Sequence, residues 1–336
     1  MSKILNLTEE NINNFYEEII NTKNDVINKI TSSEKINHLE KIIFWSNILL
    51  LFAIFTIWIP YNIFGIISLS LFIMARWTIV GHHVCHGGYD KCNMIQYNSK
   101  VFGIGSLYRK FNDWFDWFSI KAWKYEHNKF HHYYLNENND PDLVENAFDK
   151  VNNSLFYLIA SIFTWRWSYY ASNTFVRYYI NKYNTKYPNK YIYNFNEMYT
   201  IFRIFNLRFD VIINFIKSIL PYFAVMFLII PLIYSMLFNS IDIGINVLIN
   251  IFFAEICANI HTFIIIITNH AGNDLYRFNE PIWKYKNKNN NIEFILRAIY
   301  GSVNFTYGSD ICDFLHGYLN YQIEHHMFPE LSTLEY

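Results

Sequence analysis

Three short clusters of histidines are the residues of this chain most able to do chemistry. Eight of the twelve histidines fall in them: His82, His83 and His86; His127, His131 and His132; and His325 and His326. Residues four apart on a helix lie on one face about one turn apart, so such a pair can converge on one ion. Imidazole suits zinc, copper, iron and nickel, and one metal takes only a few protein ligands. This many clustered imidazoles therefore predicts two metals.

The composition predicts that these clusters belong to a membrane protein. Only 16% of the 336 residues are charged and 52% are hydrophobic, whereas soluble domains are about a quarter charged. A net charge of −1 argues against a nucleic-acid partner. The four cysteines lack zinc-type spacing, which indicates free thiols in a reducing compartment. Residues 1–41 are polar and contain no signal peptide, so we expect a cytoplasmic N-terminal segment.

Four apolar stretches predict two helical hairpins, at about 42–60 with 61–80 and 218–238 with 243–267. Each stretch is long enough to cross about 30 Å of hydrocarbon. Neither hairpin turn contains lysine or arginine, whereas the N-terminal segment, the stretch 91–217 and the tail are rich in both. The positive-inside rule places both turns outside and the rest in the cytoplasm. The predicted fold is an all-α integral membrane protein in which residues 42–336 form four transmembrane helices with a cytoplasmic helical cap.

One further apolar segment, residues 151–165, is short and ends at Arg166. If it crossed the membrane, the first two histidine clusters would lie on the opposite side from the third. A shared metal site needs an even number of crossings, so we interpret this segment as a helix lying in the membrane interface. The tryptophan-rich stretch 111–123 has a similar character.

This topology brings all three clusters to one face of the membrane, together with His270, which follows the fourth span. His38, His261 and His316 are single histidines, which we interpret as ordinary polar residues. Glu255 lies inside the fourth span. A carboxylate in a membrane is costly and is usually functional or paired, and the sequence leaves both roles open.

The three histidine clusters, also called histidine boxes, are interleaved with two hairpins. Clusters and hairpins in this order resemble the membrane fatty acid desaturase superfamily, from Ile42 to the end of the sequence. The third box, residues 322–329, is similar to that of front-end desaturases, in which glutamine replaces the first histidine. The resemblance implies a non-haem di-iron centre that uses O₂ to remove two hydrogens from an acyl chain. The implied iron ligands are His82, His86, His127, His131, His132, His270, His325 and His326. Asn269, beside His270, fits a water-mediated contact, and Gln322 of the third box is a further candidate neighbour of the ligands. His83 and His316 lie beside the family positions, and the sequence leaves open whether they are extra contacts or neither.

The chain departs from the family in two respects. It has no His-Pro-Gly-Gly haem motif, and the 41 residues before the first span are too few for a fused cytochrome b5. We therefore expect an external cytochrome b5 or ferredoxin-type electron donor, in the endoplasmic reticulum membrane. The sequence also runs only ten residues past His326, less than is usual in the family, which suggests a shortened C-terminus.

Neutral imidazoles bind a metal through one nitrogen and need the other N–H oriented, usually by a carboxylate or carbonyl. The candidate acids for this role are Glu126, Asp140, Asp142, Asp274 and Glu324, each of which could equally be a solvated surface acid. The expected function is desaturation of an acyl chain of a fatty acid or lipid. Three alternatives stay open. The first is a hydroxylase or monooxygenase with the same metal core. The second is a zinc-dependent membrane hydrolase, which needs about three protein ligands and one open position, and the third is a scaffold without metal.

Overall fold

The computed structural model describes residues 8–116, 119–138, 140–143, 155–167, 178, 181–182, 185, 209–272, 275–278, 290–305 and 308–336. Within these residues every regular element is a helix, which confirms the all-α prediction. Four helices there are long and apolar enough to cross a membrane: Ser32–Thr56, Ile63–His86, Ile212–Leu237 and Ile241–Ile267. The four predicted spans are therefore confirmed, and the protein is an integral membrane protein.

The first hairpin differs from its prediction at both ends. Helix α2 (Ser32–Thr56) begins ten residues before position 42, because Thr31 and Glu34 form a capping box that starts the helix in polar sequence. The second span begins as α3 (Ile63–Met74), continues through the π-helix η1 (Ala75–Gly81) and ends as α4 (His82–His86). It includes the first histidine cluster, whose residues continue the helix; the side chains of His82 and His83 are buried and that of His86 is partly buried. The end of the second span that hydropathy predicted, residue 80, is therefore six residues too early.

The first arm of the second hairpin begins nine residues before the predicted position 218, at Phe209, whereas its second arm lies within two residues of the predicted 243–267. The first arm consists of α10 (Phe209–Ala224), the π-helix η8 (Val225–Ile229) and α11 (Ile230–Leu237). The second arm is α12 (Ile241–Ile267). Asn250, buried in α12, donates side-chain hydrogen bonds to the carbonyls of Ile57 and Ile59 at 2.7 and 2.8 Å. This polar residue therefore ties the second hairpin to the turn of the first.

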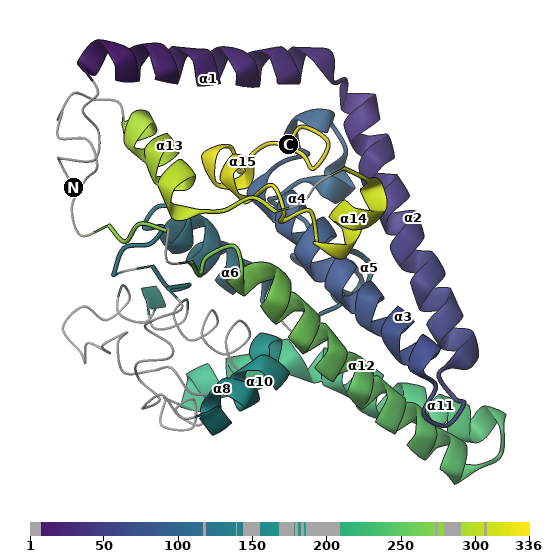
Figure 1. Ribbon diagram of the computed structural model, residues 1–336. Helices are drawn as coiled ribbons and strands as arrows, with labels where there is room; N and C mark the ends of the chain where they lie inside the picture. The colour runs from purple at the N-terminus through teal and green to yellow at the C-terminus, as the bar shows by residue number, and fades with distance from the viewer. Residues whose placement is uncertain are drawn as a thin grey trace.

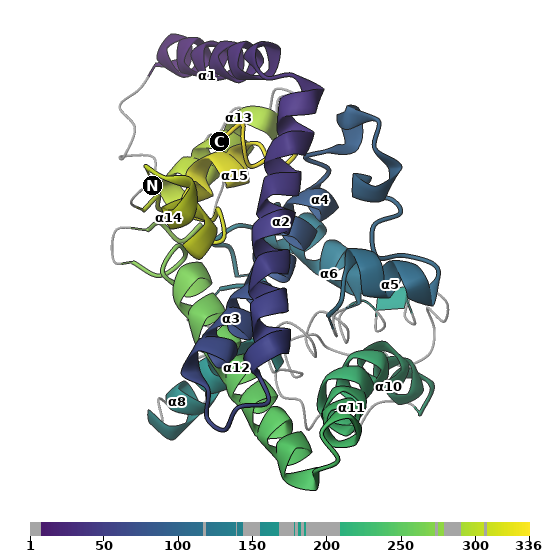
Figure 2. The ribbon, with the colours of Figure 1, turned by 90° about the vertical axis from the view of Figure 1, so that its right-hand side faces the viewer.

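The four spans form one slanted bundle in which α3 packs against α2 and α12, and α12 packs against α11 (Figure 1). Helices α13 (Asn290–Gly301), α14 (Asp310–Leu315) and α15 (Gln322–Met327) lie near α4, at the end of the bundle opposite the α11–α12 turn. Helix α1 (Glu9–Lys29) crosses the same end, where it buries Ile12 against Ile292 and Leu296 (Figure 2). The N-terminal segment is thus a packed part of the cap.

Helix α8 (Leu155–Phe163) is the described part of the ambiguous segment 151–165. Nine residues span about 14 Å, which is too short to cross a membrane. Leu155 and Phe156 leave 68% and 73% of their surface exposed, and α8 packs against α12. The described part of the segment is not among the four spans, and its place in the membrane interface stays a prediction; residues 151–154 lie outside the described part.

Glu255 is paired. Arg166, fully buried just after α8, donates from Nη1 to Glu255 Oε2 at 2.9 Å and from Nη2 to Asp116 Oδ2 at 2.5 Å. The Tyr222 hydroxyl and the Trp167 indole also donate to the Glu255 carboxylate. Of the two roles left open for this residue, the structure favours structural pairing: the network joins α12 and α10 to the segment that follows α8.

Candidate metal centre

Gly81 sets the position of the first histidine cluster. The ring of Trp114 lies where a side chain at this position would be, since a β-carbon there would sit 1.5 Å from a ring carbon. The absence of a side chain lets Trp114 pack against the end of the second span. His82 and His86 follow on α4, and their ring centroids are 4.9 Å apart.

The second cluster forms a π-helix, η4 (His127–His131), rather than an α-helix. The backbone N–H of His132 donates to the His127 carbonyl at 3.1 Å, an i→i+5 hydrogen bond. In an α-helix His132 would be rotated by about 140° from His127, because each residue turns about 100°. In the wider π-helical turn, the residues four and five positions after His127 lie on the same side of the helix as His127. All three imidazoles therefore face the site.

The remaining histidines come from α15 and from the end of α12. His325 and His326 are buried on α15, and His270 is buried just after the last turn of α12. Seven of the predicted ligands fall into two groups. The four-histidine group consists of His82, His86, His127 and His325, and the three-histidine group consists of His131, His270 and His326.

The spacing within each group fits a metal ion. One donor atom from each member lies within 4.8 Å of those of the others. In the four-histidine group, Nε2 of His82 lies 3.0 Å from Nε2 of His325 and 3.3 Å from Nε2 of His127. Metal–nitrogen bonds of about 2.0–2.1 Å separate neighbouring ligand nitrogens by about 3.0–3.4 Å. These imidazoles are thus spaced as ligands of one ion would be.

Two side chains lie between the groups. The His132 ring centroid is 4.5 Å from those of both His86 and His326. The Asp142 carboxylate lies 3.8 Å from His127 Nδ1 and 3.5 Å from His131 Nδ1, and can form a third ligand group with these two residues. Asp142 was expected only to orient ligands, but its position also allows it to bind metal.

Asp140 orients His131. Its Oδ1 accepts a hydrogen bond from His131 Nδ1 at 2.9 Å. Its two carboxylate oxygens also accept the backbone N–H groups of Asn136 and Asp142, at 2.8 and 2.9 Å. Because Nδ1 carries the shared proton, Nε2 of His131 is left for a metal. The sequence predicted five candidate acids that could orient a histidine in this way, and Asp140 is one of them.

Burial and charge set the protonation of the site. Burial holds the pKa values of His132, His270, His325 and His326 well below the ordinary value, and lowers the pKa of His127 to about 4. These rings are therefore neutral near pH 7, as metal ligands must be. His131 differs: burial disfavours its charge, but Asp140 and Asp142 outweigh burial and raise its pKa to about 9. A metal ion binding at Nε2 of His131 would therefore have to displace a proton from that nitrogen.

The hydrogen bonding of the rings also fits a metal. The buried Nε2 atoms of His86 and His132 have no hydrogen-bond partner among the described residues. Leaving a buried polar atom without a partner costs about 1–3 kcal/mol. Since both atoms lie among other imidazole nitrogens, bound metal would satisfy them. The imidazoles of this site are therefore suited to bind two metal ions.

Gln322 presents its amide nitrogen to the three-histidine group. The Asn269 amide donates to the Leu319 carbonyl at 2.8 Å and to Gln322 Oε1 at 3.2 Å. This leaves Nε2 of Gln322 2.9 Å from Nε2 of His326 and 3.0 Å from Nε2 of His270. Gln322 is therefore placed as a hydrogen-bond donor beside the metal position, and Asn269 fixes its orientation.

Aromatic residues surround the ligands. Trp123 stacks on His127 with centroids 4.5 Å apart, and the Tyr336 hydroxyl lies 3.2 Å from Nδ1 of His325. His83 stacks on His82 but belongs to neither ligand group. The sequence did not single out Trp123 or Tyr336, because neither lies in a box.

The other candidate residues lie outside the ligand groups. His38, His261 and His316 bond to Thr333, to the Leu315 carbonyl and to the Cys312 carbonyl, at 3.1, 2.7 and 2.8 Å. Glu324 accepts a hydrogen bond from Asn304. Glu126 is buried beside the second cluster, and Asp274 lies outside the described residues.

An all-helical membrane protein with two adjacent groups of buried imidazoles is the class that this fold and site define. A family model described as fatty acid desaturase matches residues 56–336. The chain therefore belongs to the fatty acid desaturase family. Searches of curated proteins and of solved structures found no match.

Proposed function

We propose that this protein is a membrane-bound, O₂-dependent desaturase that introduces a double bond into an acyl chain, using a di-iron centre. The observation that carries the proposal is the pair of buried imidazole groups, which meet at one end of a bundle of apolar helices. Membership of the fatty acid desaturase family supports it.

Each group would hold one iron; His132 and Asp142 lie between the two histidine groups. Bound irons would supply O₂ activation and the removal of two hydrogens, which amino-acid side chains cannot do to an unactivated C–H bond. The protein's own residues prepare this site. Asp140 keeps the His131 proton on Nδ1, Gln322 places an N–H donor beside His270 and His326, and Trp123 covers His127.

We further propose that electrons come from a separate cytochrome b5 or ferredoxin-type protein, at the cytoplasmic face of the endoplasmic reticulum. The absence of lysine and arginine from both hairpin turns supports this orientation. The ligand groups lie at the opposite end of the bundle from the α11–α12 turn, close to α4 and α15.

A hydroxylase would use the same ligands, so the site itself does not separate the two reactions. A zinc hydrolase needs about three protein ligands and one open position, whereas seven imidazoles in two groups favour a two-metal centre.

Lipid profiling tests the proposal. The chain is expressed in a host that supplies cytochrome b5, with His326→Ala as the inactive control. A new unsaturated acyl species that is absent from the control is expected. A hydroxylated species would replace the desaturase with the hydroxylase, and unchanged lipids with active cytochrome b5 present would contradict an enzymatic role.

A further inference from the structure

The hydroxyl group of Tyr336 lies 3.2 Å from Nδ1 of His325. On the other side of the same ring, Nε2 of His325 lies 3.0 Å from Nε2 of His82, among the nitrogens of the four-histidine group. A ring that binds a metal through Nε2 carries its proton on Nδ1, so His325 would donate this hydrogen bond and the tyrosine oxygen would accept it. Tyr336 thus contacts His325 in the way that Asp140 contacts His131.

We propose that Tyr336 is a positioning residue of the metal centre, whose hydroxyl holds the His325 ring so that Nε2 faces the four-histidine group. This inference rests on the proposed metal centre and adds a residue from outside the histidine boxes. The Tyr336 ring supports the same orientation. It meets the His325 ring edge to face, with centroids 5.9 Å apart and planes at 87°, and its centroid lies 5.7 Å from that of His83. A rotation of His325 would break both the hydrogen bond and the ring contact.

The segment 331–336 folds back from α15 against the first histidine cluster. The backbone carbonyl of Leu331 approaches Gly88 so closely that a β-carbon there would lie 2.7 Å from the carbonyl oxygen. The Glu335 carboxylate closes a turn in this segment, because it accepts hydrogen bonds from the backbone N–H and the hydroxyl of Ser332, at 2.8 and 2.7 Å. Tyr336 follows this turn directly, so its position depends on how the turn is held.

Residues of α2 hold this turn. Lys35 forms an ion pair with Glu335, and the side chains of the two residues are only 11% and 1% exposed. Nδ1 of His38 lies 3.1 Å from the hydroxyl oxygen of Thr333. Both α2 residues precede the part of the chain that matches the family model, residues 56–336. A segment outside that match therefore helps to hold the turn beside a candidate ligand.

Iron retention by the purified full chain in detergent tests this inference. Tyr336→Phe removes the hydroxyl and keeps the ring. We expect the affinity for one of the two irons to fall by about tenfold, the lower end of the effect of losing a partner of a metal-bound histidine. Titration with a chelator should then remove one iron well before the other. The Mössbauer spectrum should change for one iron only, because only one iron has the altered ligand.

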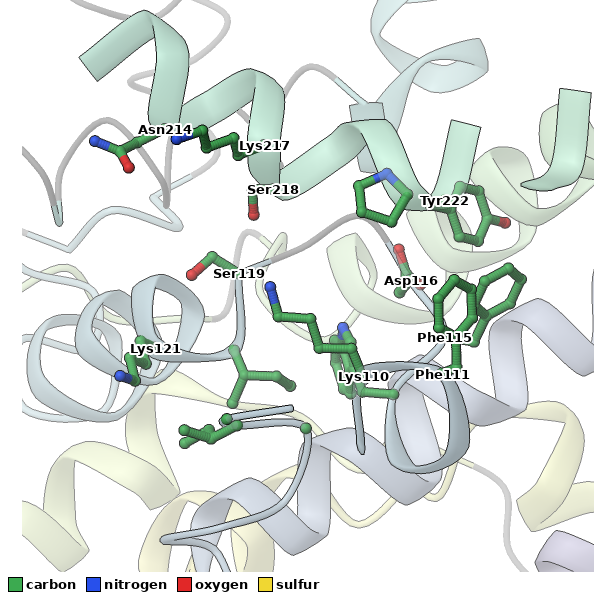
Figure 3. A pocket seen from close by; sticks show the side chains of 16 residues that line it. Lys110, Phe111, Phe115, Asp116, Ser119, Lys121, Asn214, Lys217, Ser218 and Tyr222 are labelled. Carbon is green, nitrogen blue, oxygen red and sulfur yellow. The ribbon is translucent and has the colours of Figure 1, made fainter. Parts of the chain in front are cut away.

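Tyr222→Phe is the matched control, since it also removes a hydroxyl group that makes a buried hydrogen bond. The Tyr222 hydroxyl donates to Glu255, and its side chain lies near that of Asp116 (Figure 3). Its loss leaves a buried carboxylate with one donor fewer, which lowers stability. This control should release both irons as the wild type does, so it separates lost stability from lost positioning.

Lys35→Gln tests how the tyrosine is held. We expect it to lower the affinity for the same iron by about threefold, because Glu335 loses its cation. In a chain that already carries Tyr336→Phe it should have no further effect, since the two changes act through one contact. Lys41→Gln, which breaks the exposed ion pair with Asp310, is the control for this variant.

Iron release from Tyr336→Phe like that from Tyr222→Phe would overturn the inference, and so would an equal weakening of both irons. Additive losses in the double variant would overturn the role of Lys35 in holding the tyrosine. The lipid products of the same variants are scored separately. Two irons in the wild type and selective loss from Tyr336→Phe, without any new lipid product, would support the inference and contradict the proposed desaturase.

Discussion

The Asp140 carboxylate accepts a hydrogen bond from Nδ1 of His131 at 2.9 Å, and two backbone N–H groups hold that carboxylate in place. This pair connects the second histidine box to the loop that follows it. A ligand held in this way would need no reorientation on metal binding, so the contact would prepare the three-histidine group for an ion.

Replacing Asp140 with asparagine should weaken iron binding by about 10–100-fold, the usual effect of losing such a partner. The amide keeps the size of the side chain but removes the charge that supports the His131 proton. Titration of the iron-loaded protein with a chelator measures the change. Asp310→Asn is the control, since Asp310 faces Lys41 instead of the ligand groups. Equal iron retention in both variants would contradict this role for Asp140.

Gln322→Leu separates a hydrogen-bond donor from a metal ligand at this position. Because the Gln322 amide nitrogen faces His270 and His326, we expect iron content to stay near the wild-type value. Product formation should fall by about 100-fold, as when one donor is removed from an active site. Loss of one iron per chain would instead show that Gln322 binds the metal through its oxygen.

The buried network around Glu255 predicts an unequal effect of two substitutions. Arg166→Met leaves two buried carboxylates without their cation, which should cost about 3–5 kcal/mol of stability. Glu255→Gln keeps a hydrogen-bonding side chain and leaves Arg166 paired with Asp116, so it should cost only about 1 kcal/mol. Thermal unfolding of both variants in detergent measures which of the two loses more stability. A larger loss for Glu255→Gln would show that the network was misassigned.

Gly81→Ala should disturb the first histidine cluster without touching a ligand. The added β-carbon would meet the Trp114 ring at 1.5 Å, and overpacking of this kind costs about 1–3 kcal/mol. The expected result is a lower unfolding temperature together with weaker iron binding. A variant with wild-type stability and wild-type iron content would mean that Trp114 can move aside at little cost.

Hydropathy and charge were sufficient to predict the four spans, since each is long and apolar and the two hairpin turns that join them in pairs contain no lysine or arginine. Residue spacing was sufficient to select the histidines, because repeated imidazoles at helical intervals are rare. The start of α2 was missed because a capping box operates in polar sequence, and the end of the second span was missed because buried histidines count as polar in a hydropathy window.

Contacts between residues far apart in the chain could not be predicted from the sequence. The partner of Glu255 is Arg166, 89 positions away, and no local pattern links the two. The π-helical turn that brings His131 and His132 to one side has no simple spacing signal, since the α-helical rule accounts for His131 alone.

The number of iron atoms bound to each purified chain tests the central claim most directly. Elemental analysis of the wild-type protein, expressed with ample iron, is predicted to give two iron atoms per chain and little zinc. A single zinc ion per chain, or no bound metal after purification without chelator, would contradict the di-iron centre and with it the proposed desaturase.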